Sequence, residues 1–259
     1  MCFNQPMSFA MAAWGLLCSY LVHRRTGEWK LSGGMFFFFT MEFLQGIQYW
    51  WIGDCGSMVN KFLTLLGLVH IIFQPFFTHL MCSSLVLSQV DKGKYKIILG
   101  LCIIGALWLL LRLLLYPWAQ VPVTDACPST EWLRGSEMCT YAGNVHLAWS
   151  VPLYDQTYFI PSSSLHFFLM FAPFMLMGKS MIILGTFLML TGPFLASYIT
   201  PNLHEQASIW CFYSCVQTAL MMLLYKFEHG TNHLPYKIAI LKKKAEAEKA
   251  AKAKAAKAN

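Results

Sequence analysis

Long apolar runs separated by short polar joints follow one another along this chain of 259 residues. A bilayer core is about 30 Å thick, and a helix crosses it with roughly 20 apolar residues. Seven runs have about that length, so the pattern predicts an all-α, polytopic membrane protein. The predicted transmembrane helices cover residues 7–23, 34–53, 58–87, 95–117, 158–178, 180–200 and 208–227.

Basic residues in the joints predict the orientation of these helices, because cytoplasmic loops carry an excess of Lys and Arg. On one side, apart from the tail, they are Arg24, Arg25, Lys30, Lys92, Lys94, Lys96 and Lys179. The other side has only Lys61 and Arg134, and Arg112 lies near enough to that end of its helix to extend toward water. The sequence therefore predicts an N-terminus outside and a cytoplasmic C-terminus.

The chain is expected to form one membrane domain, residues 1–228, followed by a basic tail, residues 229–259. The one sizeable extramembrane segment, about residues 118–157 on the outer side, is rich in the turn formers Pro and Gly. Lys, Ala and Glu make up most of the tail and favour helix, but they offer little apolar surface. We expect a solvated cytoplasmic helix or a frayed end; the alternative is electrostatic attachment to anionic lipid headgroups.

Composition supports a multi-pass membrane location and argues against nucleic acid as a partner. Only 12% of the residues are charged, where a soluble domain has about a quarter. The net charge is +7, but the basic residues are concentrated in the joints and from Lys226 onward. This is the distribution of a membrane protein and not a binding stripe for nucleic acid.

Four cysteines fall on the outer side of the predicted topology, where an oxidising environment permits disulfides. They are Cys2, Cys55, Cys127 and Cys139. Cys127–Cys139 is the first expected pairing and Cys2–Cys55 the second. Four free thiols are the alternative, because spacing alone does not define connectivity.

Polar residues inside the second and third predicted helices mark a candidate pocket. Glu42 and Gln45 lie on one helical face, and His70 and Gln74 lie on another. At 1.5 Å per residue, Glu42 is about 16 Å and His70 about 18 Å below the outer end of its helix. Because the two helices are antiparallel neighbours, we expect the carboxyl group and the imidazole to meet, as an ion pair or with one shared proton.

Other helices add polar groups, so the sequence predicts an outward-opening polar pocket within the membrane. Ser162 and His166 share a face in the fifth helix, and Gln217 lies in the seventh. Prolines in three helices remove a backbone donor and free a carbonyl about one turn earlier. They are Pro75, Pro173 and Pro193.

Three functions fit these residues. The first is a structural membrane subunit, in which the polar groups form hydrogen bonds between helices. The second is the binding or transport of a small solute, a proton or a cation, because carboxylate and imidazole chains form proton relays. The third is a metal-dependent hydrolase acting on a lipid-like substrate, with zinc or another transition metal as cofactor. Its candidate ligands are His70, His166 and His204 with Asp54 or Glu42, although the chain has no H-E-x-x-H motif.

Several segments resemble those of an uncharacterised family of membrane proteins found in bacteria, some eukaryotes and viruses. They are MCF at 1–3, MEFLQ at 41–45, LTLLG at 63–67, HIIFQPFF at 70–77, HE at 204–205 and IWCFYS at 209–214. The resemblance extends over most of residues 1–227. It implies a seven-helix membrane fold and no assigned activity.

The layout is also loosely similar to that of the membrane hydrolases that include alkaline ceramidases and adiponectin-type receptors. Those proteins carry a paired His motif in the last helix, whereas the seventh predicted helix here contains no His. This second resemblance therefore implies a layout, and no zinc ligand is carried over from it.

Overall fold

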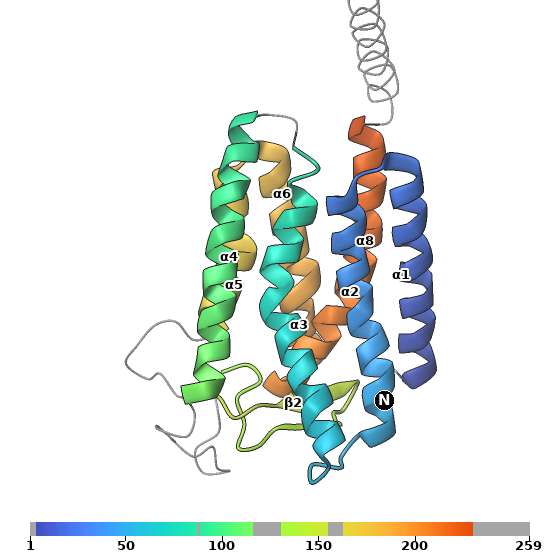
Figure 1. Ribbon diagram of the computed structural model, residues 1–259, viewed down its shortest axis with the longest axis vertical. Coiled ribbons are helices and arrows are strands. Elements are labelled where there is room, and N and C mark those ends of the chain that lie inside the picture. Colours follow the sequence, from blue (N-terminus) through green and yellow to red (C-terminus); the bar gives the residue numbers. More distant parts are fainter. Residues whose placement is uncertain (1–3, 87–88, 116–130, 155–162, 230–259) are drawn as a thin grey trace, which may run out of the picture. The chain divides into compact units, whose positions relative to one another are not determined.

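The computed structural model describes residues 4–86, 89–115, 131–154 and 163–229, and most of them are helical (Figure 1). The chain divides into two units, Met1–Thr218 and Ala219–Asn259, and the description below concerns the first. The expected basic tail lies almost wholly outside the described residues.

Four helices form the first half of the chain. They are α1 (Gln5–Thr26), α2 (Trp29–Gln48), α3 (Met58–Cys82) and α4 (Gln89–Leu115), with a 3₁₀ turn (Tyr49–Trp51) after α2. Two strands follow, β1 (Cys139–Ala142) and β2 (Leu147–Ser150), which pair antiparallel. The second half has α5 (Ser163–Phe171), α6 (Lys179–Met189), α7 (Leu195–Ile199) and α8 (Leu203–His229). A 3₁₀ turn (Ala172–Leu176) follows α5, and a π-helical turn (Leu190–Phe194) joins α6 to α7.

Local sequence signals explain where α1 begins and ends. The Asn4 side chain accepts a hydrogen bond of 3.1 Å from the Met7 amide and caps α1, and Pro6 occupies its first turn. Gly27 ends α1 with a left-handed φ of 68°, and its N–H donates to the carbonyl of His23.

The mainly helical class is confirmed, and three helices are long and apolar enough to cross a membrane. They are Met58–Cys82, Val90–Leu115 and Lys179–Ile199. Ser163–Leu176 is also apolar but shorter. The strictly all-α prediction is wrong in one place, because residues 139–150 form a two-stranded hairpin.

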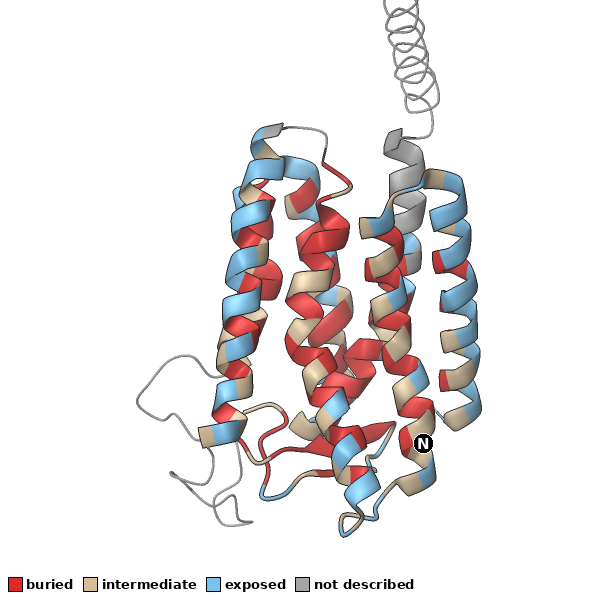
Figure 2. Cartoon of the chain, in the orientation of Figure 1, coloured by how far each residue is buried: buried red, intermediate tan, exposed pale blue. Residues whose placement is uncertain are grey.

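Burial differs sharply between the helices. In Figure 2 much of α3 is buried, whereas α1 exposes most of its length. The exposed side chains of α1 include Trp14, Leu17 and Tyr20, and an apolar surface of this kind marks contact with lipid or with a protein partner. On its other side α1 packs so closely on α2 that a side chain at Gly15 would collide with the Phe39 ring.

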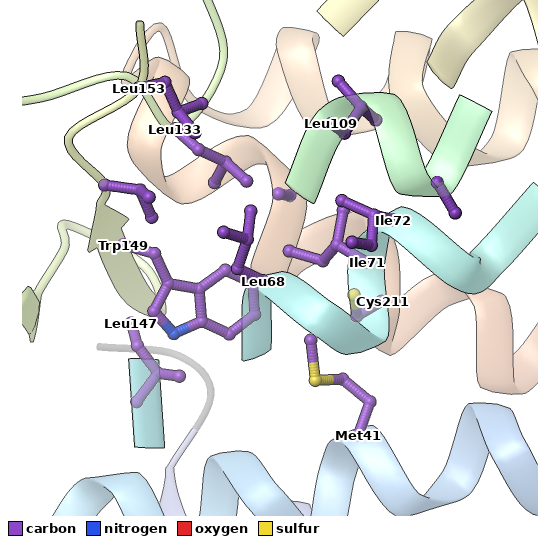
Figure 3. Packing of buried hydrophobic residues seen from close by; sticks show 13 residues of the cluster. Met41, Leu68, Ile71, Ile72, Leu109, Leu133, Leu147, Trp149, Leu153 and Cys211 are labelled. Carbon is purple, nitrogen blue, oxygen red and sulfur yellow. The ribbon is translucent and has the colours of Figure 1, made fainter. Parts of the chain in front are cut away.

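The β1–β2 hairpin packs into one end of the helical bundle, called the hairpin end below. Leu147 and Trp149 are buried and join a cluster with residues of α2, α3, α4 and α8 (Figure 3). The Trp149 indole N–H donates to Gln48 Oε1 at 3.1 Å, and the Gln48 amide in turn donates to the Leu63 carbonyl. The described part of the expected 118–157 loop therefore belongs to the core of the first unit.

A disulfide fixes this hairpin to the connection between α2 and α3. Cys55 and Cys139 are bonded, with Cα atoms 5.0 Å apart. Both expected pairings, Cys127–Cys139 and Cys2–Cys55, are wrong, because each would use a cysteine of this bond. Cys2 and Cys127 themselves lie outside the described residues. The Asn60 side chain of α3 also pairs with both backbone groups of Thr140, which places the strand where the bond can form.

Candidate functional site

A cavity of about 40 Å³ lies between α3, α4, α5, α8 and the segment before and after the hairpin. Gln74, Arg112, Ser163 and His166 contribute polar groups to its lining, and the other lining residues are mainly apolar. A buried water needs about 10–15 Å³ of such volume, so the cavity has room for about three or four. It is much smaller than an ordinary small-molecule pocket of about 300–1,000 Å³.

His166 is the polar group of this cavity that most clearly needs a partner. Its side chain is 5% exposed, and neither ring nitrogen has a hydrogen bond to any described residue. The ring packs edge-on against the Trp210 indole, with centroids 5.9 Å apart. A neutral imidazole has one donor and one acceptor, and leaving both unpaired in the interior is unfavourable. Water in the cavity would satisfy them.

Glu42 and Gln45 form a second set of buried groups on α2. Both are fully buried, and no oxygen or nitrogen of either side chain has a well-formed hydrogen bond within the described residues. The Ser8 hydroxyl of α1 lies near enough to interact with the Glu42 carboxyl group. Glu42 also interacts electrostatically with Cys211 and Cys215 of α8.

The structure does not join His70 to Glu42. The His70 Nε2 lies 2.6 Å from the Phe37 carbonyl oxygen, and its ring stacks on the Phe37 ring at 3.9 Å. A carbonyl can only accept, so Nε2 carries the proton, and Nδ1 is buried without a partner in the described part of the chain. No hydrogen bond or ion pair connects His70 with Glu42 among the described residues, and the expected contact is wrong.

Gln74 connects the cavity with the Glu42 group. Its side chain lines the cavity, and its Nε2 donates to Cys211 Sγ at 3.1 Å. Cys211 is one of the two thiols that interact with Glu42. The Gln74 and Cys211 side chains therefore lie between the His166 cavity and Glu42. His166 is on α5 and Glu42 is on α2.

Gln217 has a structural explanation. Its Nε2 donates to the Leu188 carbonyl at 3.0 Å and to Thr191 Oγ1 at 2.7 Å. Leu188 lies five residues before Pro193, which is the spacing of a π-helical bond, and proline has no N–H to donate. Gln217 replaces that donor, which is how a carbonyl freed by a proline inside a helix can be satisfied by a neighbouring helix. Ser162, another predicted pocket residue, lies outside the described residues.

Glu205, at the start of α8, holds the hairpin turn in place. Its Oε1 accepts from the amides of Val145 and His146, at 2.5 and 2.6 Å. Its Oε2 accepts from the Thr200 hydroxyl at 2.7 Å. A side chain at Gly143 would collide with the same carboxylate, so this glycine allows the turn to approach closely.

His146 connects the turn with α2. Its Nδ1 lies 2.9 Å from the Tyr49 hydroxyl, which follows α2. The residue is fully buried, and burial lowers the pKa of its imidazole to about 3. At neutral pH His146 is therefore uncharged.

Arg112 and Glu131 form a buried ion pair beside the cavity. Arg112 Nη1 and Nη2 donate to the two Glu131 oxygens at 2.5 and 2.8 Å, and Nη2 also donates to the Tyr154 carbonyl. Burial alone would raise the pKa of Glu131, but the hydrogen bonds and charge of Arg112, with the Ser163 amide and the Arg134 charge, lower it overall. Arg112 is 1% exposed, so the expectation that it extends toward water is wrong.

The candidate metal ligands do not form one site. His204 Nε2 donates to the Arg134 carbonyl at 2.8 Å, and its Nδ1 lies 2.8 Å from the Tyr141 hydroxyl. Asp54 is exposed on the α2–α3 connection, while His70 and His166 are buried. No three His, Cys, Asp or Glu side chains in the described ranges are grouped so that they could hold a metal ion.

Comparison with known proteins identifies the family. A model described as a family of unknown function (DUF5765) matches residues 6–228. The chain belongs to this family. The expected resemblance to an uncharacterised family is thus confirmed, and the match covers nearly all of the predicted membrane domain. No curated protein and no solved structure matches this DUF5765 chain significantly. Its function has to be argued from the site itself.

The sequence did not reveal two of the buried groups described above. The sequence assigns no role or partner to Glu205 or to Glu131. The available signal for Glu205 was its position in the first turn of a helix, where a carboxylate is favoured. Nothing in the sequence indicated that it would accept hydrogen bonds from residues 145 and 146.

Proposed function

We propose that this chain is a seven-helix integral membrane protein, with its N-terminus outside and its C-terminus in the cytoplasm, which binds protons in a buried polar cluster and passes them across the bilayer. The three helices of sufficient length and apolar character support the membrane location. The large apolar side chains exposed on α1 support a lipid-facing surface. The distribution of basic residues supports the orientation.

One observation carries the proton-binding role. His166 is a buried imidazole with both ring nitrogens unpaired within the described residues, and it lines a cavity with room for water. An imidazole beside ordered water can accept a proton at one nitrogen and release one from the other. Ionisable groups inside a membrane domain are costly and usually functional.

Glu42 would be the second proton-carrying group. A carboxylate buried with only the Ser8 hydroxyl close enough to interact is very unfavourable, so we expect Glu42 to hold a proton or to bind a cation. The Gln74–Cys211 hydrogen bond lies between its surroundings and the cavity. The small volume favours a proton or a small cation over a bulky solute.

Proton flux into vesicles tests the proposal. The full chain is reconstituted in liposomes that contain a pH-sensitive dye, with valinomycin and equal potassium on both sides to hold the membrane voltage at zero. A pH gradient should then collapse faster than in empty vesicles. Glu42→Gln and His166→Phe should each reduce the flux to the background level, because each removes a group that can exchange a proton.

Glu137→Gln is the matched control, because Glu137 is an exposed carboxylate of the hairpin region. It should carry protons at the wild-type rate. Wild-type flux no greater than that of empty vesicles would overturn the proposal. So would Glu42→Gln and His166→Phe proteins that conduct as well as the control. Repeating the assay with a sodium or potassium gradient and no pH gradient distinguishes a proton from a small cation.

A structural membrane subunit is the second candidate, and a specific observation favours it. His70, Gln74 and Gln217 all make hydrogen bonds between helices. If no ion moves and each pocket substitution lowers thermal stability, this role replaces the first. Metal-dependent hydrolysis is not carried forward, because its candidate ligands are dispersed in the described part of the chain.

A further inference from the structure

A second buried polar pair lies at the opposite end of the bundle from the hairpin, on α3 and α4. His79 is fully buried, and its Nε2 lies 2.9 Å from the Leu169 carbonyl oxygen of α5. Leu169 lies four residues before Pro173, so this carbonyl has no helical N–H to accept from. His79 supplies the missing donor. The sequence had identified the free carbonyl but not the residue that would satisfy it.

This bond fixes the protonation of the His79 ring. Because a carbonyl can only accept, Nε2 carries the hydrogen, and Nδ1 of the neutral ring has a lone pair. That Nδ1 is buried and has no hydrogen bond to any residue in the described ranges. The ring is therefore held rigidly at one nitrogen and offers an unused acceptor at the other.

Tyr95 of α4 provides the complementary group. Its side chain is 1% exposed, and its hydroxyl also lacks a partner among the residues described. The rings of Tyr95 and His79 are neighbours, with centroids 5.9 Å apart. The Phe174 ring also packs on His79, at 5.1 Å, so part of the wall is apolar.

We infer that a buried water molecule connects these two side chains, accepting a hydrogen bond from the Tyr95 hydroxyl and donating one to His79 Nδ1. Buried waters typically occupy places where such polar groups are otherwise unsatisfied. One water between the two rings would satisfy both groups, each of which is otherwise buried without a hydrogen bond to the described residues.

Two further polar groups at this end of the bundle lie near the Tyr95 hydroxyl. Asp91, one helical turn before Tyr95, interacts electrostatically with the Tyr95 hydroxyl, as does the Cys82 thiol. Asp91 is partly exposed and pairs with Lys94 at 3.1 Å.

Solid-state NMR of the full chain in bilayers, with ¹⁵N-labelled histidine, tests the site. The His79 Nδ1 resonance, assigned by its loss in His79→Gln, should have the shift of a hydrogen-bonded acceptor and a cross-peak to water. Tyr95→Phe should remove the cross-peak and lower the melting temperature, because the water loses a partner. Tyr198→Phe is the control, since Tyr198 is 90% exposed and should change neither measurement.

Two results would overturn the water site. One is a His79 Nδ1 with the shift of a free lone pair and no contact to water. The other is Tyr95→Phe protein that melts at or above the wild-type temperature, because removing an unsatisfied buried hydroxyl is not destabilising.

Proton flux in vesicles separates the water site from the proposed function. A wild type that shows the water contact but no flux overturns the proposed function and leaves the water site intact.

Discussion

Glu205 and Glu42 are two fully buried carboxyl groups whose surroundings differ completely. Glu205 accepts hydrogen bonds from two backbone amides and one hydroxyl at the hairpin end. Glu42 lies in the middle of α2 and has no well-formed hydrogen bond within the described residues. The two carboxyl groups are thus equally buried, but only Glu205 is fully hydrogen-bonded.

On the proposed function, this difference distinguishes a carboxylate that holds the fold together from one that exchanges protons. A buried carboxylate that accepts from three donors holds those donors in place. A buried carboxyl group without donors is unfavourable when charged, so a folded protein retains it only at some cost. Unsatisfied buried polar groups in native structures call for an explanation, and ligand or proton binding is one.

Removing Glu205 should have the largest effect on stability. Glu205→Ala leaves the amides of Val145 and His146 and the Thr200 hydroxyl without an acceptor. Hydrogen bonds to charged groups contribute about 1.5–3 kcal/mol each and are not additive, so we expect a loss of about 4 kcal/mol. Thermal unfolding in lipid nanodiscs measures it. Glu137→Ala is the exposed control, and equal melting temperatures for the two variants would contradict the anchoring role.

Breaking the Arg112–Glu131 pair should be the next most harmful change. Arg112→Met removes both guanidinium hydrogen bonds to the Glu131 carboxylate, and removing one partner of a buried pair costs about 3 kcal/mol or more. Arg112→Met/Glu131→Met should recover part of this loss, because neither member of the Arg112–Glu131 pair is then left without the other. The same unfolding assay compares the two proteins. A double variant less stable than the single one would show that the pair itself, and not the unpaired charge, determines the cost.

Acid should loosen the hairpin through His146. Its pKa is lowered to about 3 by burial, whereas an unfolded His has a pKa of about 6.5. Between these values the unfolded segment binds more protons, so stability falls as the pH falls, by up to about 1.4 kcal/mol per pH unit. Glu131, whose pKa is lowered, loses its stabilising contribution only below about pH 4.3.

Hydrogen exchange of the β1 and β2 amides, compared at pH 6.5 and pH 5.5 after correction for the intrinsic rate, measures the His146 effect. Protection should fall in wild type and change much less in His146→Asn. Identical pH dependence in the two proteins would assign the effect to other groups.

The sequence predicted the helices well because their signal is local. The third predicted helix, residues 58–87, corresponds to α3 (Met58–Cys82), and the second overlaps α2 and its 3₁₀ turn. The burial of Glu42, Gln45 and His166 followed from their positions inside apolar runs. These predictions need only helical periodicity and the length of a membrane span.

Predictions that depended on how helices face one another were less successful. Glu42 and His70 were paired because their depths agree, but His70 meets α2 at Phe37, five residues from Glu42. Five residues correspond to about 7.5 Å along a helix and to a different face. Equal depth along two neighbouring helices therefore does not show that two side chains touch. The Cys55–Cys139 bond could not be predicted for a similar reason, because it depends on a hairpin that folds back onto the α2–α3 connection.

Glu42→Gln should have the smallest effect on stability and a decisive effect on proton passage. The amide has almost the same shape as the carboxyl group and cannot ionise, so we expect a change in unfolding free energy within about 1 kcal/mol. Glu205→Gln should be more harmful than Glu42→Gln, because an amide nitrogen cannot accept the hydrogen bonds that one carboxylate oxygen accepts. Melting temperatures of the two glutamine variants, measured beside wild type, compare the two sites directly. If Glu42→Gln destabilises the protein as much as Glu205→Gln, Glu42 has a structural partner and the distinction between the two carboxyl groups fails.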